Sequence, residues 1–304
     1  MLAWASRRYC SAVSGRPPLR FSLVGPGRVG SSLAHWACGS GARLDRVAGR
    51  DLAGAEALAR SLGGLAVDLA HLDSSASDLL LIAVADPALP AVAERLARCR
   101  QAAVALHTSG AAPAEALAPL RAAGSAIGSL HPLKSFPQSL PDLAEARGVV
   151  FGIDGDAEAL RLAADLAARW GARTVAVPAA ARLAYHLAAT LASGGVVTLL
   201  AAADEIARRA GLPGLVLAGY IELAGGSLER AASSRPVARA ITGPVARGDR
   251  ETVEAELASL RSSVPELAPL VVEVARATLW LRSSLEGGDR DEHRALGRVL
   301  DEPA

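Results

Sequence analysis

A glycine-rich turn between a short strand and a helix constrains the fold of this chain more than any other feature. An apolar strand, residues 21–24, leads directly into a G-x-G-x-x-G turn, and an apolar helical pattern follows over residues 31–38. In such a turn the first glycine permits a tight bend, the second lets a pyrophosphate approach the backbone, and the third lets the helix pack on the strand. The helix N-terminus then offers free N–H groups to the phosphates. We therefore predict a Rossmann dinucleotide-binding domain whose cofactor-binding turn consists of Gly25, Pro26, Gly27, Arg28, Val29 and Gly30.

The residues after the second predicted strand indicate which dinucleotide binds. This strand covers about residues 44–48 and is followed by Gly49, Arg50 and Asp51. A site for NAD places an acidic residue there to accept hydrogen bonds from the ribose, whereas a guanidinium can pair with the 2′-phosphate of NADP. Because Arg50 precedes Asp51, we predict NADP(H) in preference to NAD(H).

The N-terminal half alternates between short apolar strands and Ala/Leu-rich helices. This alternation predicts an α/β fold with a doubly wound parallel sheet over residues 21–178. After Pro178 the pattern changes to long helices, which predicts an all-helical second domain over residues 179–304. The further predicted strands cover residues 78–84, 102–106, 126–130, 151–154 and 174–177, and the predicted helices include residues 52–62 and 89–100.

Polar residues follow directly after several of these strands. Ligands of doubly wound sheets bind outside the carboxyl ends of the strands, so these residues are expected to line one crevice. We predict that Asp86 and His107 contact the cofactor and that Ser109 binds substrate. His107 and His131 have the alternative role of capping the strand ends.

The segment from His131 to Pro137 contains the only lysine of the chain, Lys134. All the other residues counted as Lys or Arg are arginines. An ammonium has a pKa that its surroundings can lower, whereas a guanidinium stays protonated. Two prolines stiffen the segment. We predict that Lys134 is a catalytic residue and that His131 binds substrate, with an exposed loop position as the alternative for Lys134.

A long apolar helix, predicted over residues 181–210, carries a short polar stripe. At 100° per residue its four polar members fall within roughly 80° of one another. Charged residues mark the exposed faces elsewhere in this chain, whereas this stripe consists mostly of short uncharged groups and one histidine. It is therefore interpreted as the lining of a pocket, with a solvated face as the alternative. In that pocket His186 is a second candidate for catalysis and Ser193 a candidate substrate ligand. The stripe consists of Arg182, His186, Thr190 and Ser193.

A glycine-containing loop between helices, residues 241–249, offers a hydroxyl and a cation. We predict that Thr242 and Arg247 bind a carboxylate of the substrate. An ordinary connection between two helices is the alternative.

Composition excludes several classes of protein. The formal charge is +1 and aromatic residues make up 3% of the chain, which argues against nucleic-acid binding. The three cysteines are scattered and have no C-x-x-C spacing, so neither a metal site nor a disulfide framework is expected, and a reducing, cytoplasmic location is predicted. Residues 1–20 are basic and are interpreted as a disordered tail, with an organellar import signal as the alternative. The uncharged run 187–203 is interpreted as a buried helix, and no membrane span is predicted.

These motifs together resemble a known family, the Rossmann-like oxidoreductases whose C-terminal half is the domain of unknown function 2520. The resemblance covers about residues 21–300 and is most specific in the segments 131–136 and 242–249. Further matching residues are His107 to Gly110, Tyr185, His186, Ala192 and Ser193.

More distantly, the chain is similar to the phosphogluconate-dehydrogenase-like superfamily. That superfamily includes β-hydroxyacid dehydrogenases, pyrroline-5-carboxylate reductase, prephenate dehydrogenase and ketopantoate reductase. The resemblance implies a nicotinamide cofactor, a helical second domain and a homodimer formed through it, and for the closer family it implies an alternative ketopantoate reductase. Where β-hydroxyacid dehydrogenases carry a catalytic lysine, this chain has His186.

The leading hypothesis is therefore an NADPH-dependent reductase of a small 2-oxo acid, in which Lys134 or His186 donates the proton. If Lys134 is the donor, Lys134→Ala should lower turnover sharply and leave the affinity for NADPH nearly intact. Two alternatives stay open. One is an enzyme of the same superfamily that reduces imines or oxidises a prephenate-type substrate, and the other is an NADP-binding sensor without turnover.

Overall fold

The computed structural model describes residues 17–137, 139–286 and 291–301, which form two compact units. The first unit extends to Thr190 and the second begins at Leu191. Most of the predicted N-terminal tail, residues 1–16, lies outside the described residues. The boundary between the units thus lies twelve residues after the boundary that the sequence predicted at Pro178. The first helix after Pro178 stays with the sheet domain because Arg182 ties it there.

The first unit contains an eight-stranded sheet in the order β3-β2-β1-β4-β5-β6-β7-β8. The chain leaves β1 toward β2 and β3 and then returns to the other side of β1 to form β4, which creates the topological switch point of a doubly wound fold. This confirms the predicted α/β architecture. The strands are β1 (Arg20–Val24), β2 (Arg43–Ala48), β3 (Leu65–Ala66), β4 (Leu79–Ile82), β5 (Val104–His107), β6 (Ala126–Pro132), β7 (Val150–Gly155) and β8 (Arg173–Ala176).

One pair of strands departs from the predicted parallel arrangement. β6 and β7 are antiparallel, while every other neighbouring pair is parallel. A parallel pair needs a long crossover, usually through a helix that packs on the sheet. The described residues of the connection between β6 and β7 form only the short 3₁₀-helix η4 (Leu143–Ala146), so the chain reverses direction there.

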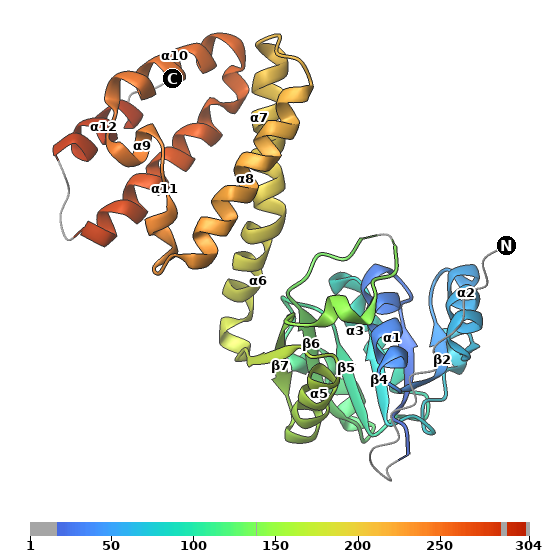
Figure 1. The fold of residues 1–304 in the computed structure, drawn as a ribbon. Helices are drawn as coiled ribbons and strands as arrows, with labels where there is room; N and C mark the ends of the chain where they lie inside the picture. The colour runs from blue at the N-terminus through green and yellow to red at the C-terminus, as the bar shows by residue number, and fades with distance from the viewer. Residues whose placement is uncertain (1–16, 138, 287–290, 302–304) are drawn as a thin grey trace. The chain divides into compact units, whose positions relative to one another are not determined.

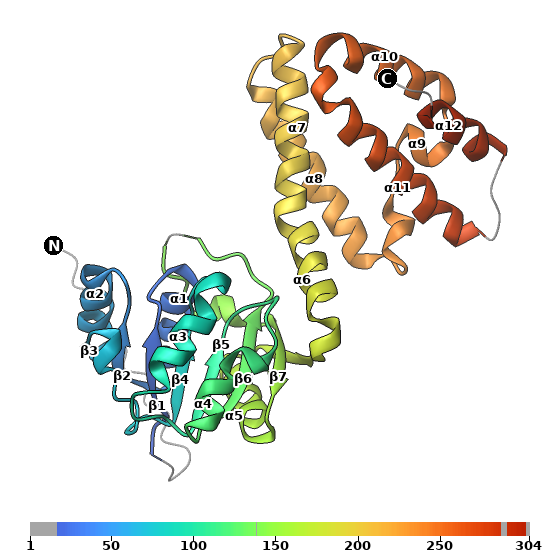
Figure 2. The same ribbon diagram turned by 180° about the vertical axis from the view of Figure 1, so that it is seen from behind.

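Helices cover both faces of the sheet, as the two opposite views show (Figures 1 and 2). Alternate strand residues face opposite sides, so that Leu79 and Leu81 pack with one helical layer and Leu80 and Ile82 with the other. The first layer consists of α1 (Arg28–Gly39), α2 (Leu52–Leu62) and α5 (Ala157–Arg169), and the second of α3 (Leu89–Leu96) and α4 (Ala118–Ala122).

An aromatic cluster fixes the loop that follows β6. The ring of Trp36 lies 5.4 Å from that of Phe136 and 6.0 Å from that of Trp170. Its Nε1–H also donates a hydrogen bond to the carbonyl oxygen of Asp142 (2.9 Å). Burial of these rings anchors the loop that carries Lys134 on the first helical layer.

Arg182 attaches the helix α6 (Arg182–Thr190) to the first unit. Its side chain is only 1% exposed, its Nε donates to the carbonyl of Ala112 (3.1 Å), and its Nη2 donates to the hydroxyl of Ser129. A buried cation is stable only where hydrogen bonds replace its hydration. Helix α6 therefore belongs to the sheet domain.

The second unit is helical throughout its described residues, as predicted. It begins with the π-helix η6 (Leu191–Gly195), where two consecutive glycines interrupt the α-helical pattern. Its α-helices are α7 (Val196–Arg209), α8 (Leu215–Ser233), α9 (Pro244–Arg247), α10 (Arg250–Ser263), α11 (Ala268–Glu286) and α12 (Asp291–Asp301). The remaining 3₁₀-helices of the two units are η1 (Leu69–His71), η2 (Asp86–Ala88), η3 (Ala114–Leu117), η5 (Ala179–Ala181), η7 (Val237–Ala240) and η8 (Pro265–Leu267).

One helical run, Ala179–Arg209, is long and apolar enough to cross a membrane by length and composition alone. None of its most apolar window is buried within the structure. Helices that are covered in a soluble protein meet the same criterion, so this finding is weak support for a span.

Candidate functional site

The glycine-rich turn has the geometry that each of its glycines predicts. Gly25 has φ +90°, and a Cβ there would lie 2.3 Å from the carbonyl oxygen of Ala83. A Cβ on Gly30 would lie 2.1 Å from the carbonyl oxygen of Gly25, so only glycine lets α1 pack this closely. Gly27, at the N-cap of α1, has no described atom within 4 Å of its Cβ position. The backbone is thus open to a phosphate where the motif requires it.

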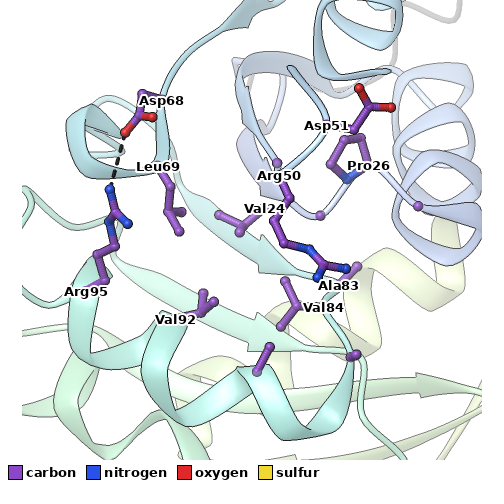
Figure 3. A pocket seen from close by; sticks show the side chains of 15 residues that line it. Val24, Pro26, Arg50, Asp51, Asp68, Leu69, Ala83, Val84, Val92 and Arg95 are labelled. Carbon is purple, nitrogen blue, oxygen red and sulfur yellow. Dashed lines mark hydrogen bonds and ion pairs between the residues drawn. The ribbon is translucent and has the colours of Figure 1, made fainter. Parts of the chain in front are cut away.

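A cavity of about 620 Å³ opens beside this turn, at the switch point between β1 and β4 (Figure 3). Its position matches the crevice in which doubly wound sheets bind dinucleotides. The predicted turn and Arg50 both contribute to its walls. The lining residues are Val24, Gly25, Pro26, Gly27, Gly49, Arg50, Asp51, Asp68, Leu69, Ala83, Val84, Ala85, Ala88, Val92 and Arg95.

The charged residues of this cavity point in different directions. Arg50 extends across it toward Ala83, whereas the carboxylate of Asp51 is directed away (Figure 3). Asp51 is the N-cap residue of α2. On the opposite wall Arg95 lies 3.5 Å from Asp68 in an ion pair. The guanidinium of Arg50, rather than the neighbouring carboxylate, therefore faces the cavity.

His107, predicted to contact the cofactor, has both ring nitrogens engaged by backbone. It is fully buried at the end of β5. Its Nδ1 accepts the N–H of Ser109 (3.2 Å), and its Nε2 therefore carries the proton and donates to the carbonyl of Pro113 (3.1 Å). Burial lowers its pKa to about 4. This arrangement fits the alternative role of capping the strand end.

Ser109 lies in the same turn. It is 6% exposed, and its hydroxyl oxygen accepts the N–H of Ala112 (2.9 Å). The hydroxyl therefore holds the turn closed while keeping its own proton for a further acceptor. Its predicted contact with substrate stays a prediction.

At the end of β6, three aromatic side chains come together within the first unit. His131 Nδ1 lies 2.8 Å from the hydroxyl oxygen of Tyr185, and the ring of His186 lies 6.0 Å from that of His131. Tyr185 and His186 project from α6. The structure thus joins the predicted residues His131 and His186, although 55 positions separate them in the chain.

Two glycines make room for this cluster. A Cβ on Gly152 would lie 2.5 Å from the Tyr185 hydroxyl. A Cβ on Gly110 would lie 2.6 Å from Nδ1 of His186 and 2.7 Å from Nε2 of His131. Both imidazoles therefore lie against the backbone of Gly110.

The electrostatic surroundings keep His131 neutral. Burial lowers the pKa of His131 to about 4, and the neighbouring His186 and Arg182 lower it as well. Asp86, which follows β4, opposes this shift and acts on His107 in the same direction. Asp86 therefore lies close enough to both histidines to affect their charge, so the ends of β4, β5 and β6 contribute to one electrostatic environment.

The other predicted site residues lie in the loop after β6 or in the second unit. Lys134 Nζ lies 3.5 Å from Glu145 Oε2, in an ion pair across the loop. In the second unit, Arg247 ends α9 with a largely exposed side chain, 4.0 Å from Asp249. Thr242 is also exposed there, and Ser193 is exposed within the π-helix. Ser193, Thr242 and Arg247 thus lie in the second unit, whereas Lys134 lies in the same unit as His131 and His186.

No site role was predicted for Tyr185, Gly110 or Gly152. Apart from the family resemblance, no pattern in the sequence marks Tyr185 as a site residue. Gly152, inside a strand, did carry a signal, because glycine in a strand often marks the close approach of another group. Among the described residues, no group of three or more His, Cys, Asp or Glu side chains could hold a metal ion.

Comparison with known proteins agrees with this architecture. Residues 10–132 match the family described as Rossmann-like domain, and residues 149–278 match the domain of unknown function DUF2520. The fold and the glycine-rich turn define a Rossmann-like protein with a helical C-terminal domain. The chain combines the Rossmann-like and DUF2520 domains, as the sequence motifs indicated. No curated protein matches it.

Several solved structures share the fold. Protein TM1727 from Thermotoga maritima is 26% identical with a TM-score of 0.70, covering 87% of this chain and 99% of its own. A candidate NADP oxidoreductase from Bacteroides fragilis is 21% identical with a TM-score of 0.71, covering 86% and 98%. A reductive aminase from Aspergillus terreus, solved with NADPH and ethyl levulinate, is 20% identical with a TM-score of 0.61, covering 93% and 99%.

Proposed function

We propose that the protein is an NADPH-dependent oxidoreductase that reduces a small 2-oxo acid, with ketopantoate as the first compound to test. One observation carries the proposal. The same unit contains a dinucleotide cavity with an inward-facing arginine and a pair of adjacent imidazoles, one at the end of β6 and one on α6.

The cavity supports NADP(H) as the cofactor. The open backbone at Gly27 and the N-terminus of α1 suit a pyrophosphate, and Arg50 suits a 2′-phosphate because it can form charge-assisted hydrogen bonds with it. The similar reductive aminase binds NADPH, and a similar imine reductase from Myxococcus stipitatus binds NADP⁺. We extend this cofactor to the present chain on the basis of Gly27 and Arg50.

The imidazole pair supports reduction of a carbonyl. NADPH supplies a hydride, and its addition to a carbonyl carbon builds negative charge on the oxygen, which then needs a proton. His131 and His186 lie beside one another and together can supply N–H groups to that oxygen. Lys134 remains the other proposed donor. Ser109, Ser193, Thr242 and Arg247 remain proposed ligands of the substrate.

Reduction of an imine is the second candidate, since the fold is shared with the reductive aminase and the imine reductase. An imine nitrogen is already basic, so such a site has less need of a proton donor. Two adjacent imidazoles therefore favour the carbonyl. A sensor that binds NADP without turnover is the third candidate.

The test is NADPH consumption by the purified protein with a panel of 2-oxo acids and cyclic imines, ketopantoate first. We expect a 2-oxo acid to be turned over fastest. His186→Gln and Lys134→Ala, measured side by side, identify the donor as the variant with the larger loss of turnover at unchanged NADPH affinity. Consumption with cyclic imines alone would favour the second candidate, and tight binding without consumption the sensor.

We also propose that a second copy of the chain covers the exposed apolar surface of the helices. Leu183, Leu187 and Leu191 are more than half exposed along one helical run, and Leu215 on α8 is 81% exposed. Apolar patches of this kind mark interfaces. Light scattering in detergent-free buffer should give the mass of a dimer. A monomer that stays in solution only with detergent would favour a membrane instead.

A further inference from the structure

We propose that Tyr185 fixes the tautomer of His131, so that the Nε2–H of His131 and Nδ1 of His186 together bind the reacting oxygen of the substrate. This inference deepens the proposed function and rests on it for the identity of the substrate. It makes His131 and His186 catalytic residues and Tyr185 a positioning residue.

The first step concerns the proton between Tyr185 and His131. His131 Nδ1 lies 2.8 Å from the hydroxyl oxygen of Tyr185 and is the described partner for its O–H proton. A phenolic O–H is a stronger donor than acceptor, whereas an unprotonated imidazole nitrogen is a strong acceptor. A phenol has a single proton to donate, so Nδ1 of His131 is the acceptor. Because His131 is neutral, its one N–H must then lie on Nε2.

The second step concerns where Nε2 points. A Cβ built on Gly110 would meet Nε2 of His131 at 2.7 Å and Nδ1 of His186 at 2.6 Å, so both nitrogens lie close to the Gly110 backbone and near one another. Nδ1 of His186 is buried and has no hydrogen-bond partner among the described residues. A buried polar atom without a partner is costly, which indicates that a ligand atom completes the site.

A purely structural role explains less of this geometry. A tyrosine that only packed α6 on the sheet would not require its hydroxyl over Gly152, where any side chain would collide with it. Nor would it require a glycine at position 110 to keep two imidazole nitrogens clear. At both positions the missing side chain lets polar atoms, the Tyr185 hydroxyl or the imidazole nitrogens, approach the backbone.

The chemistry balances with these groups. The carbonyl carbon accepts the hydride that NADPH supplies, and the carbonyl oxygen accepts a hydrogen bond from His131 Nε2–H. In its charged form, His186 passes the proton on Nδ1 to that oxygen and becomes neutral. Solvent then returns a proton to His186. The products are a 2-hydroxy acid and NADP⁺.

The test combines a spectroscopic measurement with kinetics on the full chain. Nitrogen-15 NMR of the histidine side chains at pH 7 should show His131 as the Nε2–H tautomer. Adding oxamate, an unreactive analogue of a 2-oxo acid, to the NADPH-loaded protein should shift the signals of His131 Nε2 and His186 Nδ1. Tyr185→Phe should mix the His131 tautomers and lower kcat by about 10- to 100-fold, as is typical of groups that orient a functional histidine.

Tyr220→Phe is the matched control, since Tyr220 lies on α8 in the second unit, and it should leave both readouts unchanged. An Nδ1–H or charged His131 in the unmodified protein, or no response to oxamate, would overturn the proposal. So would a kcat for Tyr185→Phe within twofold of the unmodified enzyme. If no compound is turned over, the proposed reduction fails, while the tautomer and the oxamate shift still decide whether the two-imidazole site exists.

Discussion

Gly110 lies so close to His186 that one methyl group at position 110 would stand 2.6 Å from Nδ1 of that histidine. The same methyl group would stand 2.7 Å from Nε2 of His131. Both distances are far shorter than van der Waals contact, and the two rings come from elements distant in sequence. The absence of a side chain at this one position therefore lets both imidazoles approach the same stretch of backbone.

Gly110→Ala should abolish most turnover while leaving NADPH affinity within about twofold, because the methyl group would displace both imidazoles and position 110 does not line the dinucleotide cavity. A loss of about 100-fold or more in kcat/KM corresponds to losing one proton-transfer group. Steady-state kinetics and NADPH fluorescence titration measure the two effects. Gly297→Ala, on α12, is the control, since no described atom lies within 4 Å of its Cβ position. Full activity of Gly110→Ala would remove the imidazole pair from the mechanism.

Arg50→Ala should weaken NADPH binding by about 10- to 100-fold, the cost of a hydrogen bond to a charged group. NADH has no 2′-phosphate, so its affinity should change little. Calorimetric titration of both cofactors gives the ratio. Arg60→Ala removes an exposed arginine of α2 that does not line the cavity, and it should alter neither affinity. Equal losses for NADPH and NADH would show that Arg50 does not read the 2′-phosphate.

The buried His107 predicts how stability depends on pH. Its pKa is about 4 in the folded protein, against 6.5 in an unfolded chain, because burial disfavours the charged imidazolium. The unfolded chain therefore binds the proton more readily. The stabilising contribution is complete above pH 6.5 and is lost as the pH falls toward 4, by up to about 3 kcal/mol.

Urea unfolding between pH 7 and 4.5 measures this loss. His107→Gln serves as the comparison, because it keeps the carboxylates that also titrate in acid and should show a shallower slope. Proton NMR should in addition show that the His107 ring does not titrate above pH 5. A titration midpoint near 6.5 would contradict the burial that the structure assigns to this ring.

Arg182→Met should lower the free energy of unfolding by about 1–3 kcal/mol. Methionine fills a similar volume, but the carbonyl of Ala112 and the hydroxyl of Ser129 lose their buried donor. Thermal unfolding measures the change. Arg161→Met, on the exposed face of α5, should have a negligible effect, since surface pairs contribute little. An unchanged melting temperature for Arg182→Met would show that α6 is held by other contacts.

Local patterns in the sequence predicted the sheet domain well. The strand–glycine–helix turn specified β1, α1 and the cavity beside them, because each glycine meets a requirement set by its immediate neighbours. The run over residues 52–62 likewise formed α2 with the same bounds. The antiparallel β7 was not predicted, since strand direction depends on the connection and not on the strand's own residues.

The imidazole cluster could be predicted only in part. His131 and His186 were each selected as candidates, but Tyr185 meets His131 across 54 residues and carries no local pattern. Arg182 was assigned to a pocket lining, whereas the fold buries it as an anchor of α6. Such roles arise from packing between α6 and the sheet, which hydrophobic periodicity does not specify.

The most direct test of the proposed reduction is to follow the hydride from NADPH into the product. The purified protein would be given NADPH deuterated at the transferable position of C4 together with the 2-oxo acid panel, and the products would be analysed by mass spectrometry. We predict a 2-hydroxy acid that carries one deuterium, formed at least about 100-fold more slowly by His186→Gln with NADPH affinity unchanged. Bound NADPH with no deuterated product from any 2-oxo acid would contradict the account.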